Sequence, residues 1–484
     1  MNRRRAFVLC LLVGLVCVLA PAMAAETEQE ADVRESGPAE LYEGEPRPPE
    51  LAPSEKTFSE WIEDVKHPAD WFEWGGDLRL RGVYTENVLT LLNEANDVSH
   101  FFRIRGRVWG RADLAEALDI EEQLSVYARI TTEPRYFAQR GLLGGTVPTW
   151  DEVVLDNLYV DWARIGGAPV SLRVGRQDMV YGRGFVILDG TPLDGSRTIY
   201  QDAIKATVHL DEWDSNLDVF YINNKAFQKR IRPLNETESP TSAFDTTVFG
   251  TYLVNKHFAP HELNAYYIYK DEDVQTNPSL RNRIVHTVGG LAQGKLEGNW
   301  DYYAEAAGQW GRQGTATRKA FGFSGDLGHT WPDAKWQPRV HAGFEYLSGD
   351  DPSTSAFEGW DPVLARWPHW SELYVYTLAP ETGLPGQYTN LQRYTLGTSV
   401  HPGENSCVDL DYSYVRANEN FNVPTMPIFD TGYTRGHLLM ARLSHTFNKY
   451  ISGHLWAEYF HPESFYIDDT DEALFLRWQL MFKF

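Results

Sequence analysis

The chain has 484 residues, of which 43% are hydrophobic and 13% aromatic, and its formal net charge is -23. A mean hydropathy of -0.41, with a single long apolar run near Met1, excludes a membrane protein built from several spanning helices. The aromatic content excludes a wholly disordered chain. The acidic charge argues against nucleic acid as a partner, because a phosphate backbone requires a basic face.

The first 24 residues have the pattern of a secretory signal peptide. Three arginines precede an apolar run over residues 6–20, which leads into the small residues of Ala22-Met23-Ala24. A retained helical anchor is the less favoured alternative, because the run is short for a bilayer. Cleavage after Ala24 removes two of the three cysteines and leaves Cys407 alone, so the exported chain is expected to have no intrachain disulfide.

Two short segments precede the main body of the chain. Residues 25–56 are acidic and rich in proline without apolar periodicity, which predicts a disordered periplasmic arm. Residues 57–70 form a short periplasmic lead-in, where Trp61, Ile62 and Val65 predict a turn of amphipathic helix. From residue 71 to residue 484 one pattern persists, which predicts a single domain.

That pattern is a period of two residues, which is typical of β-strands. In the segment Phe102–Arg111 the even positions are apolar or glycine, and four of the five odd positions are arginine. An extended strand places these arginines on one face, whereas a helix would spread them around its circumference. The last strand shows the alternation most clearly, with one face formed by Leu474, Leu476, Trp478, Leu480, Phe482 and Phe484.

About 18 segments of this kind occur along the chain. Their centres lie near Leu80, Gly106, Tyr127, Leu158, Leu172, Ala206, Val219, Gly250, Tyr267, Val288, Glu305, Phe323, Phe344, Leu396, Leu410, Met440, Trp456 and Trp478. The stretch Leu373–Tyr376 is interpreted as loop. Along the chain, many of the connections between these segments alternate between short and long. The long ones include residues 86–99 and residues 348–390. Alternating connection lengths are typical of membrane barrels, whose turns are short on one side and long on the other.

These features predict an all-β fold, a single transmembrane antiparallel β-barrel of about 18 strands with short periplasmic turns and long extracellular loops. A sheet in lipid must close, because unpaired backbone groups at an edge find no water there. Aromatic residues at predicted strand ends, such as Trp71, Tyr84, Tyr450 and Phe460, fit the interfacial girdles of such a barrel. A secreted soluble sandwich is the alternative, but it should show guarded edge strands. The barrel prediction places the chain in the outer membrane with both termini in the periplasm.

Several motifs resemble the alginate-export family of outer-membrane β-barrels. They are Asp156-Asn157-Leu158-Tyr159-Val160-Asp161, Leu172-Arg173-Val174-Gly175-Arg176-Gln177 with Tyr181-Gly182, Asp301-Tyr302-Tyr303-Ala304-Glu305-Ala306-Ala307-Gly308-Gln309, and Tyr346-Leu347-Ser348-Gly349-Asp350. The terminal strand is similar to the assembly signal of outer-membrane barrels, with Trp478, Phe482 and Phe484 as its candidate residues. The resemblance covers about Trp71 to Phe484, and the long acidic arm (Glu26–Glu55) is a departure from the family.

The resemblance implies an 18-stranded porin that exports an anionic polysaccharide passively through an arginine-lined pore. The expected partners are the polysaccharide cargo, outer-membrane lipid, the barrel-assembly machinery and a periplasmic scaffold lipoprotein, with no nucleic acid. Two alternatives remain open: a general or small-solute porin, and a barrel enzyme or adhesin that acts through its long loops.

Charged residues on the predicted inner faces are the candidates for polyanion binding. They are Arg79, Arg81, Arg103, Arg105, Arg107, Arg111, Arg129, Arg173 and Lys205, with Arg176 at the rim and the carboxylates Asp161 and Glu305 among them. Arginine suits carboxylates because its planar fork offers two parallel donors and stays charged. The alternative is a charge ladder that keeps the lumen wet, paired with Asp77, Asp113, Asp161 or Glu305. Replacing Arg103, Arg105 and Arg107 by Gln is expected to reduce anion preference and leave assembly intact.

No motif for catalysis or for a cofactor is present: the sequence has no His-Glu-x-x-His, no Gly-x-Ser-x-Gly and no phosphate-binding loop. We therefore expect no enzyme activity and no cofactor. Weak calcium candidates are Asp350, Asp351, Asp468, Asp469 and Asp471, because loop carboxylates supply the oxygen ligands that calcium prefers. None has the spacing of a defined calcium loop, so solvated surface charge is the favoured interpretation.

Overall fold

The computed structural model describes residues 58–95, 97–119, 121, 123–146, 151–188, 200–227, 230–235, 242–365, 370–377, 388–420 and 428–484. The signal peptide predicted at 1–24 and the arm predicted at 25–56 lie outside these residues. The chain divides into two units, Met1–Ala69 and Asp70–Phe484.

In the first unit, helix α2 spans Phe58–Lys66, within the segment where a short amphipathic helix is expected. Its last turn contains an ion pair between Lys66 and Glu63 at 3.6 Å, a spacing of three residues that places both side chains on one face. No helix in the described part of the chain is both long enough and apolar enough to cross a membrane.

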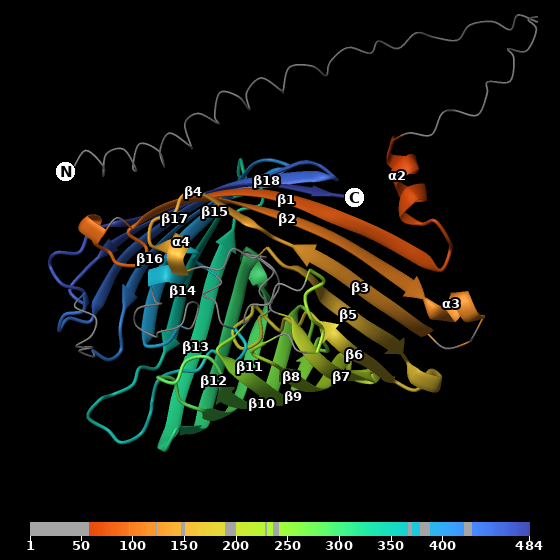
Figure 1. Ribbon diagram of the computed structural model, residues 1–484, viewed down its shortest axis with the longest axis horizontal. Helices are drawn as coiled ribbons and strands as arrows, with labels where there is room; N and C mark the ends of the chain where they lie inside the picture. Colours follow the sequence, from red (N-terminus) through yellow and green to blue (C-terminus); the bar gives the residue numbers. More distant parts are fainter. Residues whose placement is uncertain are drawn as a thin grey trace, which may run out of the picture. The chain divides into compact units, whose positions relative to one another are not determined.

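The second unit is an antiparallel sheet that closes on itself, because β1 pairs with β2 on one side and with β19 on the other (Figure 1). The strands are β1 (Phe72–Glu86), β2 (Val98–Asp113), β3 (Gln123–Thr132), β4 (Arg135–Gln139), β5 (Val153–Ala163), β6 (Val170–Gln177), β7 (Gln201–Leu210), β8 (Ser215–Asn224), β9 (Phe244–Asn255), β10 (His261–Val274), β11 (Arg283–Leu296), β12 (Trp300–Gln313), β13 (Ala316–Thr330), β14 (Arg339–Leu347), β15 (Leu391–Gly403), β16 (Ser406–Arg416), β17 (Thr434–Asn448), β18 (Ile451–Pro462) and β19 (Ala473–Lys483).

Strands β3 and β4 share one position in the wall, because both pair with β2. Residues Gly106–Asp113 of β2 pair with β3, and residues His100–Arg103 pair with β4. The 19 strands therefore make a barrel with 18 positions. The predicted fold class is confirmed, and each of the 18 predicted centres falls within a strand. The stretch Leu373–Tyr376 lies outside the wall, in helix α5 (Leu373–Thr377) of the β14–β15 connection.

The two ends of the barrel differ in their connections. At the end that we call the short-turn end, tight turns and one-turn helices join the strands. The helical turns are α3 (Leu114–Leu118), η2 (Ile165–Gly167), η3 (Asp211–Trp213) and η4 (Glu297–Asn299). The opposite end, the loop end, has most of the long connections, with η1 (Asn93–Ala95), α4 (Leu143–Thr146) and α5 among them. The exception at the loop end is the β12–β13 connection, which consists of Gly314 and Thr315 alone.

The candidate assembly residues lie where the barrel closes. Phe484 and Gly76 exchange two backbone hydrogen bonds of 3.3 and 3.1 Å, which join the C-terminus to β1. The Trp478 indole lies over Gly82, where a Cβ atom would come within 2.2 Å of Nε1. Glycine is required at that position for the close approach. Both Trp478 and Phe484 are exposed on the outer face, as their alternation in β19 predicts.

The hydrophobic core lies inside the barrel, in its loop half. The described parts of two long connections, residues 178–188 of one and residues 357–365 and 370–377 of the other, fold against the inner faces of the strands. They join each other through a backbone hydrogen bond of 2.9 Å from Leu364 to Val186. Phe460 belongs to this core: it is buried against Tyr374, so its expected place in an interfacial girdle is wrong.

Candidate functional site

The predicted arginines of β1 and β2 form a buried network on the inner face of the wall. Arg79 and Arg103 share the carboxylate of Glu133, at 2.5 and 2.8 Å. Arg105 pairs with Asp77 at 2.7 Å, and Arg81 donates to the side-chain oxygen of Gln479 at 2.6 and 3.0 Å. Arg103 is 2% exposed, and its neighbours are similarly buried. These buried ion pairs and hydrogen bonds therefore stabilise the barrel wall.

The network extends to β3 and β5 through shared carboxylates. Arg129 contacts Asp156 at 2.9 Å and Asp178 at 2.8 Å, and Arg107 lies 4.0 Å from Asp156. One carboxylate thus serves two arginines here, as Glu133 does on the neighbouring strands. Sequence reasoning missed Glu133, because it lies in the break between β3 and β4 and outside any alternating segment.

A second buried cluster holds the β14–β15 connection in the lumen. Lys270 of β10 contacts Asp361 of this connection at 2.5 Å, and Arg283 of β11 lies 3.4 Å from Asp361. Glu272 completes the cluster by pairing with both cations. Burial raises the pKa of Asp361, but Lys270, Arg283 and Arg318 more than offset it and hold that pKa below its usual range. The Gln309 side chain also exchanges hydrogen bonds of 2.7 and 2.9 Å with the Asp361 backbone.

The same connection is held a second time on the opposite part of the wall. Glu458 of β18 accepts hydrogen bonds from the Ser371 hydroxyl and, at 2.8 Å, from the Glu372 backbone amide. Arg477 of β19 pairs with the Glu372 carboxylate at 2.8 Å. The described parts of the β14–β15 connection are therefore anchored to two parts of the wall, at β10 and β11 and at β18 and β19.

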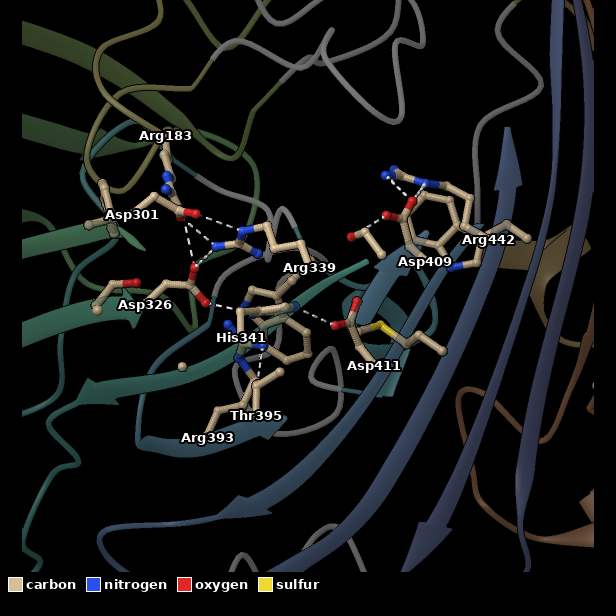
Figure 2. Close-up of a pocket in the computed structure, with 18 residues that line it drawn as sticks. Arg183, Asp301, Asp326, Arg339, His341, Arg393, Thr395, Asp409, Asp411 and Arg442 are labelled. Carbon is tan, nitrogen blue, oxygen red and sulfur yellow. Dashed lines mark hydrogen bonds and ion pairs between the residues drawn. The ribbon is translucent and has the colours of Figure 1, made fainter. Parts of the chain in front are cut away.

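A cavity of about 560 Å³ lies in the short-turn half of the lumen, against β12–β18 (Figure 2). Basic and acidic side chains alternate along its wall, and each contact between them is short. Arg339 bridges Asp301 and Asp326 at 2.6 and 2.8 Å, and His341 bridges Asp326 and Asp411 at 2.7 and 3.0 Å. The result is a mixed ladder of cations and carboxylates along this part of the lumen.

Further cations and aromatic rings line the same cavity. Arg442 pairs with Asp409 at 2.9 Å, and its side chain is 34% exposed. Arg393 pairs with Glu345 at 3.2 Å and lies over the Trp370 ring at 4.4 Å. The Trp370 and Trp456 rings that line the cavity are themselves largely buried.

Arg183 enters this cavity from the β6–β7 connection, on a turn between two glycines. Gly182 and Gly184 both have positive φ values, +57° and +85°, which favour glycine. The preceding Tyr181 is fixed by a 2.5 Å hydrogen bond to Asp218 and by stacking on Tyr252 at 4.1 Å. Through Tyr181, the turn is therefore held against β8 and β9.

The guanidinium of Arg183 remains accessible within the cavity. Its side chain is 43% exposed, and among the described residues its closest carboxylate is Asp326 at 3.9 Å. The group also lies over the Tyr303 ring at 4.2 Å. Figure 2 shows Arg183 at the edge of the ladder that Asp301, Arg339 and Asp326 form. Sequence reasoning missed Arg183 because it lies in a connection, and connections have no alternating pattern. It directly follows Tyr181-Gly182, which is part of a motif that resembles the alginate-export family.

A second cavity, of about 370 Å³, brings together four of the predicted site residues near the short-turn end. They are Arg111, Asp161, Arg173 and Lys205. Arg173 pairs with Asp161 at 2.6 Å, and Lys205 pairs with Asp218 at 3.2 Å. Arg111 is exposed and has no ion pair with any described residue.

The remaining predicted residues have local partners. Arg176 is buried, pairs with Asp202 at 2.8 Å and lies over the Tyr200 ring at 3.7 Å. Two of the four carboxylates expected to pair with cations, Asp77 and Asp161, do so. The other two have no cation partner among the described residues: Asp113 caps α3, and Glu305 accepts hydrogen bonds from Tyr266 and Tyr303.

The calcium candidates lie in loop-end connections, and three of the five accept hydrogen bonds from backbone amides. Asp350 accepts from the Glu358 amide and Asp351 from the Ser353 amide, both at 2.8 Å, and Asp471 accepts from the Asn93 amide at 3.2 Å. Asp468 and Asp469 lie in the β18–β19 connection. Within the described ranges, no three His, Cys, Asp or Glu side chains are grouped so that they could hold a metal ion.

Solved structures of outer-membrane porins share the architecture. Pseudomonas aeruginosa OpdQ aligns with a TM-score of 0.53 at 8% identity, covering 85% of this chain and 97% of that chain. Pseudomonas aeruginosa OpdO aligns with a TM-score of 0.52 at 10% identity, and OccK2 (OpdF) of the same organism with 0.52 at 9%, each with the same coverage. At these identities the likeness shows the fold.

A search of curated proteins found no match to the chain. The family model described as alginate export matches residues 70–473, which is nearly the whole barrel. The motifs that resemble this family all lie within that range. The protein is an outer-membrane β-barrel channel, and the chain belongs to the alginate export family.

Proposed function

We propose that the channel conducts an acidic polysaccharide of the uronate type across the outer membrane, without catalysis. The accessible cations of the two cavities support this cargo. Arg183 is exposed in the lumen and has its closest described carboxylate, Asp326, at 3.9 Å. Arg111 is also exposed there and forms no ion pair with a described residue. The most buried arginines, by contrast, already have acidic or amide partners.

The observation that carries the proposal is the way in which Arg183 is held in the cavity. Tyr181 fixes its turn to β8 and β9, its guanidinium is accessible, and the Tyr303 ring packs against it from one side. A guanidinium in this state offers free donors to a carboxylate and needs little reorganisation to bind one. The cavity volume of about 560 Å³ lies in the range of clefts that hold small organic groups, such as one unit of a polymer.

Conduction of small solutes is the second candidate function. The anchored β14–β15 connection favours it, because a segment held inside the barrel narrows the route for a polymer. The mixed charge ladder of the cavity also suits solutes of either sign. The two functions differ in how strongly a soluble polyuronate blocks the current.

The test is polyuronate block of single-channel current in planar bilayers. Arg183→Gln is expected to weaken the block about tenfold, because the variant loses a charged hydrogen bond to the polymer. Block by a neutral glucan of equal length should not change. Arg164→Gln is the matched control, since Arg164 is an exposed arginine paired with Asp211 outside the cavities. Equal polyuronate block in wild type and Arg183→Gln would favour the small-solute channel.

A further inference from the structure

The outer face of the wall carries a small basic patch at the loop end. It consists of Arg312 on β12, Lys319 on β13 and Arg281 in the β10–β11 connection, and all three are exposed. None of them forms an ion pair with a described residue. The patch is notable in a chain whose formal net charge is -23.

Strand register brings the three cations together. Lys319 pairs with Trp310, and Arg312 pairs with Thr317, so the two cations are diagonal neighbours on adjacent strands. Diagonal neighbours on one face of a sheet lie about 7–8 Å apart. Arg281 packs its aliphatic chain beside Gly314, in the two-residue connection that joins β12 to β13.

Lipid-facing aromatic residues adjoin the patch. Trp310 and Phe321 share the outer face with Arg312 and Lys319, and both rings are exposed. The Trp310 ring stacks on His286 at 5.3 Å with an interplanar angle of 4°, and the Tyr267 hydroxyl binds His286 Nδ1 at 2.9 Å. Aromatic side chains of this kind mark the level at which hydrocarbon gives way to headgroups.

Cations at that level face lipid headgroups and lie on the opposite side of the wall from the lumen. In the row that contains Arg312, the outward carboxylate of Asp271 lies two strands away, at about 10 Å. On the other side of the patch, Glu358 follows Phe357, which bridges β13 at Arg318, and Glu358 accepts a hydrogen bond from the Thr354 hydroxyl at 3.3 Å. Asp271 accepts a 3.4 Å hydrogen bond from Tyr269. We infer that Arg312, Lys319 and Arg281 bind the phosphate groups of an anionic lipid in the leaflet at the loop end.

The inference is tested by native mass spectrometry of the full chain in a neutral detergent. The probe is diphosphorylated lipid A, and its dephosphorylated form is the comparison. Wild type should retain the phosphorylated lipid. Arg312→Gln/Lys319→Gln should bind it about 30-fold more weakly, because each surface cation raises the affinity for an anionic lipid about fivefold. Arg312→Lys/Lys319→Arg keeps both charges and should bind as wild type does.

The matched control is Lys335→Gln/Lys449→Gln. It removes two cations that lie beside Trp336 and Tyr450 at the short-turn end, at 5.2 and 4.8 Å from the rings, and it should leave lipid A binding unchanged. Heat-dependent gel mobility checks that every variant is folded. Three results would each overturn the inference. Wild type and Arg312→Gln/Lys319→Gln could bind lipid A equally, wild type could retain the dephosphorylated lipid as well as the phosphorylated one, or millimolar inorganic phosphate could displace lipid A.

Discussion

Individual arginines of this barrel differ in role because they differ in exposure. Arg103 is buried against Glu133, where it neutralises a carboxylate that water does not reach. Arg183 stands in an open cavity and keeps donors available to a solute. The same side chain therefore stabilises the wall at one position and is proposed to select the cargo at another.

Replacing Arg103 by Gln is expected to destabilise the barrel by about 3 kcal/mol, because breaking a buried pair leaves a carboxylate without full compensation. The measurement is the urea midpoint of unfolding, followed by heat-dependent gel mobility. This revises the expectation from the sequence that exchanging Arg103 and its neighbours for Gln would leave assembly intact. The exposed Arg164→Gln variant should keep the wild-type midpoint, and an unchanged midpoint for Arg103→Gln would show that the buried pair is dispensable.

At the scale of elements, the described parts of the β14–β15 connection lie inside the barrel and are held there by buried charged groups. Two anchors hold its described parts: Asp361 against β10 and β11, and Glu372 against β19. Both anchors use buried charged groups, which bind strongly only while every partner is in place. Loss of one partner should therefore release the connection from that side of the wall.

Asp361→Asn is expected to raise the open probability of the channel in planar bilayers. The variant leaves Lys270 and Arg283 with Glu272 as their remaining carboxylate in the cluster, and a loss of about 3 kcal/mol shifts the balance between anchored and released states about a hundredfold. Asp351→Asn is the control, since Asp351 binds the Ser353 amide within its own loop. Identical gating in Asp361→Asn and wild type would mean that this anchor does not close the channel.

At the scale of the whole molecule, the strands could be predicted from the sequence because their signal is local. Each strand shows its period of two within a few residues, as Phe102–Arg111 does, and the parity of that segment places its arginines on the inner face. The 18 positions of the wall follow from counting such segments.

The interior of the barrel could not be predicted in the same way. Lys270 and Asp361 lie 91 residues apart, and the connection that contains Asp361 has no periodicity. The position of Arg183 depends on two glycines with positive φ values and on Tyr181, which is hydrogen-bonded to Asp218 of β8. His341 and Arg339 do lie on an alternating strand, so the parity of β14 would have identified them as lumen-facing residues.

The central claim, that the channel conducts an acidic polysaccharide, is tested most directly by translocation. Purified barrel is reconstituted in liposomes loaded with two labelled oligomers of equal length, an oligouronate and a neutral oligoglucan, and release of both is followed over time. The account predicts that the oligouronate leaves faster than the glucan, that Arg183→Gln reduces this difference, and that high salt reduces it by screening. Equal release of the two oligomers, or retention of both while small anions pass freely, would contradict it.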